Sequence, residues 1–351
     1  MSGSSPSTRR LGIIRSSQAG SHQLRAPSSG AWEARVKLFG RWMLERGQNE
    51  IIVSSSELAS AEKVVAQRTS QRVRVSEADE LAKRFGTYRG VTFSGTRILE
   101  YLEQFGDARN QRLVFGFLQK MHFISQADEH RMLEEAYSNL QQRLKRRHSS
   151  WTIGQIALSH VGGIDKSSLA VARTFKKANP RQLATKNISE PNELRKLADG
   201  TVTDVVVLDD FVGSGQTLIQ QLEDFAPCLP EEMTVHIVVI AAMEDGLDTV
   251  SKAATGFFGD RFVLDCLCPI KNSPGPFDIA SGFYETEQDA HDAEILLRSF
   301  GEQPEPRAPL GYGDCCTPLT FSGTIPNNAP PILWSSRSGD SGFSPLFPRN
   351  S

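Results

Sequence analysis

The stretch Val205-Val206-Val207-Leu208-Asp209-Asp210-Phe211-Val212-Gly213-Ser214-Gly215-Gln216-Thr217 decides the fold that we expect for this chain. Four β-favouring apolar residues in a row are typical of a strand that is buried on both faces of a parallel sheet. Two acids and a turn of small residues follow, and a helix is predicted to begin after them. Ligands of such sheets bind at the carboxyl ends of the strands. Asp209 and Asp210 are therefore predicted to stand in a binding site.

The turn after the two acids suits a sugar phosphate. A pair of carboxylates can accept hydrogen bonds from two adjacent ribose hydroxyls, while Gly213 and Gly215 let the backbone wrap an anion. Ser214 and Thr217 add hydroxyl donors, and the N-terminus of the predicted helix points its free N–H groups at the same anion. A buried strand with an Asp N-cap before a Gly-rich turn explains each residue separately, but it does not require the combination. A Walker-type loop is excluded because no Lys follows the second Gly.

This stretch resembles the phosphoribosyl pyrophosphate (PRPP) motif of type I phosphoribosyltransferases: an apolar strand, Asp-Asp, three variable residues, Ser or Thr, Gly, any residue, Thr. The resemblance implies that Asp209 and Asp210 hold the ribose hydroxyls and act in catalysis. It also implies that the loop binds the 5-phosphate through Gly213, Ser214, Gly215, Gln216 and Thr217. The implied cofactor is Mg²⁺, bound through the substrate, PRPP, rather than by direct protein ligands.

A second turn of small residues, Gly162-Gly163-Ile164-Asp165-Lys166-Ser167-Ser168, follows the first predicted strand of the sheet. Lys166 can neutralise a pyrophosphate, while the hydroxyls of Ser167 and Ser168 and the helix N–H groups hold its oxygens. A plain N-cap at Asp165 or Ser167 explains the turn equally well in isolation. In the phosphoribosyltransferases the turn after an early strand binds the leaving pyrophosphate, so the resemblance favours that role for Lys166, Ser167 and Ser168.

The polar segment 179–190 holds Arg181 and Lys186. The family often carries a mobile loop in this region that closes over PRPP. The resemblance therefore makes these two side chains further candidates for the site.

Strands alternate with helices of about ten residues after Trp151, which implies right-handed crossovers and a parallel sheet flanked by helices. The strands are predicted at Ile153–His160, Val205–Asp210, Val235–Ala242 and Arg261–Cys268. The helices between and after them are predicted at Ser167–Ala178, Glu193–Leu197, Gln216–Phe225 and Leu247–Ala254. The fold class is thus α/β, of the type I phosphoribosyltransferase kind, with a mainly helical N-terminal domain.

The helical domain is predicted from apolar residues at helical spacing. Three such runs follow one another and predict a bundle: Ile98, Tyr101, Leu102 and Phe105; Val114, Phe117, Leu118 and Met121; and Leu133, Tyr137, Leu140 and Leu144. Upstream, a helix is expected over Trp32–Leu44 and another from Ser76, with short strands at Ile51–Val53 and Val73–Val75.

Four regions are expected from these patterns. Residues 1–30 are rich in Ser, Gly, Arg and Pro and are predicted to be a disordered extension, although the composition also suits a transit peptide. Residues 31–148 form the helical domain, residues 149–335 form the α/β domain, and residues 336–351 are predicted to be a disordered tail.

Composition fits a soluble enzyme or binding protein. The 351 residues carry 39 Lys and Arg against 41 Asp and Glu, so no nucleic-acid partner is indicated by the charge balance. An odd number of cysteines, five, without metal-like spacing suggests a reducing cytoplasm. No apolar run is long enough to span a membrane.

The segment Phe321–Trp334 contains Pro326-Asn327-Asn328, where a structural turn and a substrate-facing loop are both open. With the helical N-terminal half and Lys166-Ser167, it resembles the PRTase-CE proteins of bacterial conflict systems over about residues 31–335. The resemblance implies a phosphoribosyltransferase-like protein that transfers phosphoribosyl to an unknown acceptor, in defence against phage. Two other classes stay open: a non-catalytic sensor of PRPP or a nucleotide, and an interaction protein that recruits partners through its helical half. The sequence does not indicate the oligomeric state.

Overall fold

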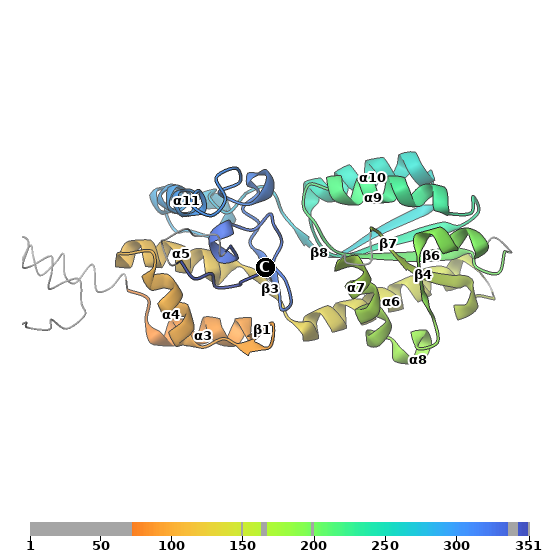
Figure 1. Ribbon diagram of the computed structural model, residues 1–351, viewed down its shortest axis with the longest axis horizontal. Coiled ribbons are helices and arrows are strands. Elements are labelled where there is room, and N and C mark those ends of the chain that lie inside the picture. The colour runs from red at the N-terminus through yellow and green to blue at the C-terminus, as the bar shows by residue number, and fades with distance from the viewer. Residues whose placement is uncertain (1–71, 149, 163–166, 198–199, 336–342, 350–351) are drawn as a thin grey trace, which may run out of the picture.

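The computed structural model describes residues 72–148, 150–162, 167–197, 200–335 and 343–349. The predictions for residues 1–30, for Trp32–Leu44 and for Ile51–Val53 lie outside this part of the chain. The described residues form two lobes that lie side by side along the longest axis (Figure 1). One lobe is built mainly of helices, and the other is built on a parallel sheet.

The sheet has five described strands in the spatial order β5-β4-β6-β7-β8, and every neighbouring pair is parallel. Its strands are β4 (Ile156–His160), β5 (Ile188–Ser189), β6 (Asp204–Val212), β7 (Thr234–Met243) and β8 (Phe262–Ile270). The prediction of a parallel sheet is confirmed. The four predicted strands are present, but residues 153–155 form a 3₁₀ turn, η1 (Ile153–Gln155), before β4. The short edge strand β5 was not predicted, because two residues carry too little periodicity.

Helices cover both faces of the sheet (Figure 1). One face packs against α6 (Gln126–Arg147) and α7 (Ser167–Ala178), and the other against α9 (Gln216–Phe225) and α10 (Glu244–Phe258). In β6, Val206 and Leu208 belong to the first apolar core, while Val205 and Val207 belong to the second. Because successive residues of β6 are buried on opposite faces of the sheet, the sequence of the strand is a continuous apolar run. The predicted bounds of α7 and α9 are confirmed.

Shorter helices connect these elements around the sheet. They are α8 (Pro180–Leu183), η2 (Pro191–Leu197), η3 (Ala226–Cys228) and η4 (Ile279–Ser281). The helix predicted at Glu193–Leu197 is the 3₁₀ helix η2.

The other lobe is assembled from both ends of the described chain. Its elements are α3 (Val75–Phe85), β1 (Thr87–Tyr88), β2 (Val91–Thr92), α4 (Gly95–Glu103), α5 (Ala108–Lys120), β3 (His122–Ile124), α11 (Glu287–Gly301), η5 (Tyr312–Asp314), β9 (Leu319–Phe321) and η6 (Pro331–Leu333). β3 and β9 pair in parallel although almost two hundred residues separate them in sequence. One aromatic-rich core therefore joins residues 78–121 to residues 284–347.

The cores do not divide at His148, where the domain boundary was predicted. The apolar residues of α6, such as Leu133 and Leu140, pack against the sheet rather than against α4 and α5. Most buried apolar residues after 284, which were assigned to the α/β domain, pack in the helical lobe instead. Leu319 and Phe321 of β9 are exceptions, because they belong to the core that α6 forms with the sheet. Helical spacing shows which face of a helix is apolar, but it does not show which partner covers that face.

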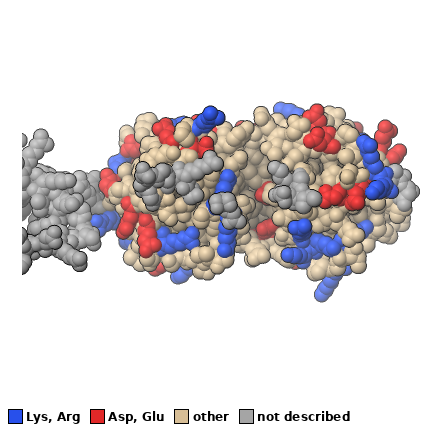
Figure 2. Space-filling model, in the orientation of Figure 1, with Lys and Arg blue, Asp and Glu red and all other residues tan. Residues whose placement is uncertain are grey.

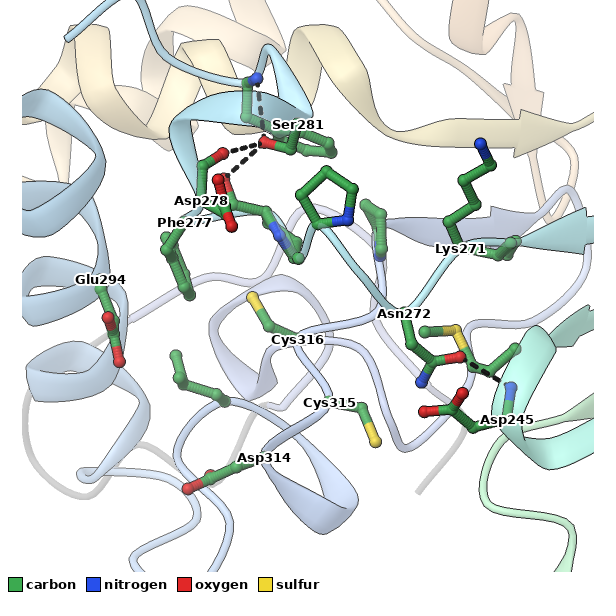
Figure 3. Close-up of a pocket in the computed structure, with 18 of the residues that line it drawn as sticks. Asp245, Lys271, Asn272, Phe277, Asp278, Ser281, Glu294, Asp314, Cys315 and Cys316 are labelled. Carbon is green, nitrogen blue, oxygen red and sulfur yellow. Dashed lines mark hydrogen bonds between the residues drawn. The ribbon is translucent and has the colours of Figure 1, made fainter. Parts of the chain in front are cut away.

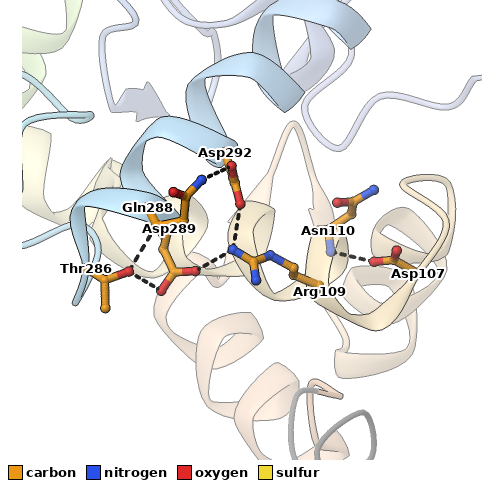
Figure 4. A network of polar contacts seen from close by, with 7 residues as sticks. All are labelled: Asp107, Arg109, Asn110, Thr286, Gln288, Asp289 and Asp292. Atoms are coloured by element: carbon orange, nitrogen blue, oxygen red, sulfur yellow. Dashed lines mark hydrogen bonds and ion pairs between the residues drawn. The ribbon is translucent and has the colours of Figure 1, made fainter. Parts of the chain in front are cut away.

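A polar network at the surface joins α5 to α11 (Figure 4). One guanidinium nitrogen of Arg109 lies 3.1 Å from a carboxylate oxygen of Asp289 and 2.6 Å from one of Asp292. α11 was not predicted from the sequence, and Val75, placed in a short predicted strand, is the first residue of α3.

Residues 343–349, which were placed in the predicted tail, pack against the helical lobe. Phe347 is completely buried and its ring lies 5.3 Å from that of Phe85 and 5.4 Å from those of Tyr88 and Phe93. One buried aromatic residue is enough to anchor a segment whose composition otherwise suggests disorder. None of the described helices is long and apolar enough to cross a membrane.

Candidate functional site: an acid pair at the carboxyl edge of the sheet

Asp209 and Asp210 lie in the C-terminal half of β6, the central strand of the sheet. β6 continues to Val212, two residues beyond the predicted end, and both acids are half-buried. Strand alternation directs neighbouring side chains to opposite faces. The side chain of Asp210 accordingly lies on the face of the sheet that α6 and α7 cover.

Asp209 is held in a setting that disfavours its charge. Its Oδ1 accepts the backbone N–H of Asp210 at 3.0 Å. Burial, and then the negative charge of Asp210, raise the pKa of the Asp209 carboxyl well above its ordinary value. Hydrogen-bond donors, such as the hydroxyls of a sugar, would therefore relieve an unfavourable charge at this position.

Asp210 is contacted by the start of α7. The hydroxyl of Ser167, the first residue of that helix, donates to Oδ1 of Asp210 at 2.7 Å. The neighbouring Ser168 is buried, and its hydroxyl donates to the carbonyl of Val161 at 2.5 Å. The two predicted pyrophosphate-binding serines therefore differ: Ser167 faces the acid pair, whereas Ser168 ties α7 to the end of β4. Lys166 lies outside the described residues.

Glu129 on α6 is a third acid near this position, and the sequence did not single it out. Burial and then the charge of Asp210 raise the pKa of the Glu129 carboxyl. No motif marks this residue, because α6 reaches the acid pair only through its packing on the face of the sheet. Among the described residues, no group of three or more His, Cys, Asp or Glu side chains is arranged to hold a metal ion.

The loop after β6 has the conformation that the glycines predicted. Gly215 has φ of 86°, in the left-handed region, and is the N-cap residue of α9. Ser214, Gln216 and Thr217 are exposed around it. The first N–H groups of α9 have no intrahelical partners, so this exposed loop and helix end offer donors to an anion.

Two close contacts hold the loop in place. A Cβ on Gly246, in the first turn of α10, would lie 2.0 Å from the carbonyl oxygen of Gly213, and a Cβ on Gly213 would lie 2.7 Å from the amide atoms of Asn328. Asn328 is buried and donates to the carbonyl of Tyr312 at 3.0 Å. Its side chain thus has a structural role beside the loop. Gly213 is needed for this close approach, which a larger side chain would prevent.

A pocket of about 810 Å³ lies between the lobes, next to this loop (Figure 3). One side is formed where β7 and β8 end, with Asp245, Lys271 and Asn272, and the amide oxygen of Asn272 accepts the backbone N–H of Asp245 at 3.0 Å. The other side comes from the helical lobe, including Cys315 and Cys316. Asn328, which touches Gly213, also lies 3.7 Å from the sulfur of Cys315. Asn328 therefore lies between the loop and Cys315, which lines the pocket.

Lys271 and Asn272 were missed by the sequence analysis. Both directly follow a strand of the parallel sheet, and that position was the available signal. Arg298 in the helical lobe also lines the pocket, where it pairs with Glu294 at 3.3 Å and with Asp314 at 3.1 Å.

Lys186, a further candidate for the site, lies away from the acid pair in this structure. Its ammonium group donates to the carbonyls of Gly154 and Ile156 at 3.2 and 2.8 Å, and burial lowers its pKa. Those carbonyls stand at the amino end of β4, the opposite edge of the sheet from the acids. Arg181 is exposed on α8, and its role as a closing residue stays a prediction.

A central parallel strand with an acid pair, a left-handed glycine turn and a helix end define a type I phosphoribosyltransferase fold. The chain belongs to the PRTase-CE family, whose sequence profile matches residues 98–349. No curated protein matches the chain significantly.

Two solved structures are among those that are similar to the chain. One is a hypoxanthine-guanine-xanthine phosphoribosyltransferase, with 14% identity over 42% of this chain and 76% of its own, and a TM-score of 0.25. The other is a hypothetical protein from Neisseria gonorrhoeae with bound ppGpp, with 14% identity over 50% of this chain and 97% of its own, and a TM-score of 0.27.

Proposed function

We propose that this protein binds PRPP at the carboxyl end of β6 and transfers its phosphoribosyl group to an acceptor, with release of pyrophosphate. One observation carries the proposal: the acid pair Asp209 and Asp210 is followed at once by the left-handed Gly215 and the free N-terminus of α9. Carboxylates for two hydroxyls and N–H groups for a phosphate thus occur at the spacing that a ribose 5-phosphate requires.

In this mechanism Asp209 and Asp210 accept hydrogen bonds from the ribose hydroxyls and orient the sugar. Their negative charge also stabilises the positive charge that develops at C1 as the bond to pyrophosphate breaks and the bond to the acceptor forms. The exposed hydroxyls of Ser214 and Thr217 and the N–H groups of α9 hold the 5-phosphate. Ser167 keeps Asp210 in position through its 2.7 Å hydrogen bond.

Mg²⁺ fits this site through the substrate. The acid pair and its hydroxyl neighbours are hard oxygen donors, which Mg²⁺ prefers, but the described residues form no cage of three ligands. When bound with the substrate, Mg²⁺ would supply positive charge that offsets the negative charge of the pyrophosphate leaving group. Asp209 and Asp210 would hold the ribose hydroxyls of that substrate.

The pocket between the lobes is the place that we propose for the acceptor. Asp245, which lines the pocket, directly precedes Gly246, and the backbone of Gly246 packs closely against the carbonyl of Gly213 in the PRPP loop. The pocket volume of about 810 Å³ is within the range of about 300–1,000 Å³ typical of small-molecule sites. By inheritance from its family, we infer that the reaction serves a bacterial conflict system, in defence against phage in the cytoplasm.

The proposal is tested by calorimetry with PRPP and Mg²⁺ on the wild-type protein and on the variant Asp209→Asn/Asp210→Asn. We expect the wild type to bind and the variant to lose binding, and pyrophosphate release with candidate acceptors then reports turnover. Binding without turnover for any acceptor would favour a sensor of PRPP over an enzyme. No binding by the wild type would overturn the PRPP assignment.

A variant in the same helix controls for general effects on the fold. Asp224 is an exposed acid of α9, away from the acid pair. Asp224→Asn is expected to bind PRPP as the wild type does. A loss in this variant as well would show that binding responds to overall charge and not to the acid pair.

A further inference from the structure

A second groove, of about 570 Å³, lies on the lobe that contains the sheet, between α7, α8 and the edge strand β5. We propose that it binds a nucleoside polyphosphate, at a site separate from the acid pair. β5 and β6 lie on opposite sides of β4, so the groove opens on the side of α7 that faces away from Asp210. The proposal does not depend on the PRPP assignment.

One side of the groove is cationic. Arg173, Lys176 and Lys177 line it, and their spacing of three and four residues sets all three on one face of α7. None of them makes an ion pair with a described residue. Figure 2 shows Lys and Arg gathered on the surface over α7 and α8. Three neighbouring cations that form no ion pair with the described acids repel one another, and a bound anion would reduce that repulsion.

The helix dipole gives a simpler explanation for the two lysines at the C-terminal end of α7, but it does not explain the whole cationic cluster. Cations in the last turn of a helix interact favourably with its dipole, and this accounts for Lys176 and Lys177. It does not account for Arg173, one turn earlier, or for the groove that the three side chains line together. Binding of an anion accounts for both.

The groove is also lined by apolar residues. They are Leu169 on α7 and Pro180, Ala184 and Ile188 from the segments that follow it. An apolar surface beside a cationic one suits a ligand with a flat, weakly polar ring at one end and several phosphates at the other. A nucleoside polyphosphate has this composition, whereas inorganic polyphosphate would leave the apolar residues without a contact.

The size of the cationic cluster also favours a small ligand over a nucleic acid. From Arg173 to Lys177, α7 rises about 6 Å, which is close to the extent of a short polyphosphate. Glu190, which also lines the groove, lies 3.3 Å from Nε2 of the buried His160, and Glu193 follows in η2. A long polyanion that continued past the cluster would meet these acids.

Calorimetry with ATP as the probe tests the site, with inorganic tripolyphosphate and an eight-nucleotide single-stranded DNA as comparison ligands at one fixed ionic strength. The groove variant is Arg173→Gln/Lys177→Gln, in which both side chains are exposed. The control is Lys83→Gln/Lys252→Gln, which removes the same charge from exposed positions on α3 and α10. Asp209→Asn/Asp210→Asn separates this groove from the acid pair.

We expect the wild type, the control and the acid-pair variant to bind ATP alike, and the groove variant to bind it at least roughly tenfold more weakly, as the loss of two charge-assisted contacts requires. Tripolyphosphate should bind more weakly than ATP. Three outcomes would overturn the proposal: equal ATP binding by the groove variant and the control, equal binding of tripolyphosphate and ATP, or binding of the DNA alone. A loss of ATP binding in the acid-pair variant only would place the nucleotide at β6 and overturn it too.

Discussion

The hydroxyl of Ser167 donates to a carboxylate oxygen of Asp210 across a gap of 2.7 Å, and this bond connects the turn after β4 to the acid pair of β6. Strands β4 and β6 are neighbours in the sheet. Their carboxyl ends therefore bring together two segments that lie more than forty residues apart in the chain.

Ser167→Ala is expected to weaken PRPP binding by roughly 3- to 10-fold, since a hydrogen bond that orients a ligand-binding carboxylate is lost. Because Ser167 is exposed, its loss should barely change the thermal midpoint. Ser168→Ala is the matched control. It leaves the buried carbonyl of Val161 without its partner and should cost about 1–3 kcal/mol of stability, with PRPP affinity unchanged. Calorimetry measures the PRPP affinity of both variants, and thermal unfolding measures their stability. If Ser167→Ala bound PRPP with wild-type affinity, the hydrogen bond between Ser167 and Asp210 would have no role in PRPP binding.

Asp209→Asn is expected to stabilise the protein at neutral pH. The folded state raises the pKa of Asp209, so it favours the neutral carboxyl, and wild-type stability falls as pH rises through that raised pKa. Asn carries no charge and retains an oxygen that can accept the N–H of Asp210. We expect a gain in thermal midpoint of roughly 2–4 °C at pH 7, the shift that about 1 kcal/mol produces in a domain of this size.

This gain should shrink as pH falls and vanish below the ordinary Asp pKa of about 3.9, where the wild-type carboxyl is neutral in both states. Thermal unfolding from pH 3 to pH 8 measures the difference, with the exposed Asp224→Asn as the control. A destabilised Asp209→Asn at pH 7 would contradict the assignment of a strained charge to Asp209.

The sequence predicted the acid pair and its loop because these residues are consecutive. A buried strand, two acids and a left-handed glycine turn are encoded within thirteen positions, and local chemistry is enough to place them. The position of Glu129 and Asn328 could not be predicted in the same way. Glu129 reaches the site through the packing of α6 on the sheet, and Asn328 reaches it from the other lobe. Neither has a local pattern that distinguishes it from a surface or turn residue.

The division of the helices between the two cores could not be predicted from the sequence for a related reason. Amphipathic spacing predicted α4, α5 and α6 correctly as helices, but α6 and α5 bury their apolar faces in different cores. α11 and the segment that contains Phe347 come late in the sequence but pack in the helical lobe, against helices from the start of the described chain. Contacts between residues so far apart in sequence leave no periodic signal, because no short window contains both partners.

Gly246→Ala should disturb the PRPP loop, whereas Gly256→Ala in the same helix should not. A methyl group on Gly246 would stand 2.0 Å from the carbonyl oxygen of Gly213, and one on Gly256 would meet nothing within 4 Å. We expect Gly246→Ala to cost about 1–3 kcal/mol and to weaken PRPP binding, while Gly256→Ala gains about 0.5–1 kcal/mol from helix propensity. Urea unfolding and calorimetry on the pair measure this. Equal behaviour of the two variants would show that the loop tolerates displacement at Gly213.

Glu77 should make the helical lobe sensitive to acid. The hydrogen bond from Arg112 holds the pKa of Glu77 at about 2, below its ordinary value of 4.5, against the opposing effect of burial. Because the folded pKa is lowered, the stabilisation is present above 4.5 and is lost as pH falls from there through 2. Glu77→Gln should cost about 1–3 kcal/mol at pH 7, and little at pH 2. The control is Glu80→Gln, which changes an exposed acid of the same helix. Denaturant unfolding at both pH values measures the free energy of unfolding of the two variants. Equal free energies for the two variants at pH 7 would contradict the prediction.

Phe347→Ala should lower the stability of the helical lobe, because the last described segment is part of the core of that lobe. The side chain is completely buried among the rings of Phe85, Tyr88 and Phe93, and the Tyr88 hydroxyl donates to the carbonyl of Pro348 at 3.1 Å. Truncation of a buried Phe costs about 3–5 kcal/mol, whereas the half-buried Phe343→Ala should cost less. Hydrogen exchange of α3 and α4 measures the effect where it arises. Unchanged hydrogen-exchange protection of these helices in Phe347→Ala would show that the segment does not stabilise the lobe. The expected loss of protection would show that the C-terminal end of the described chain is part of the core of the helical lobe.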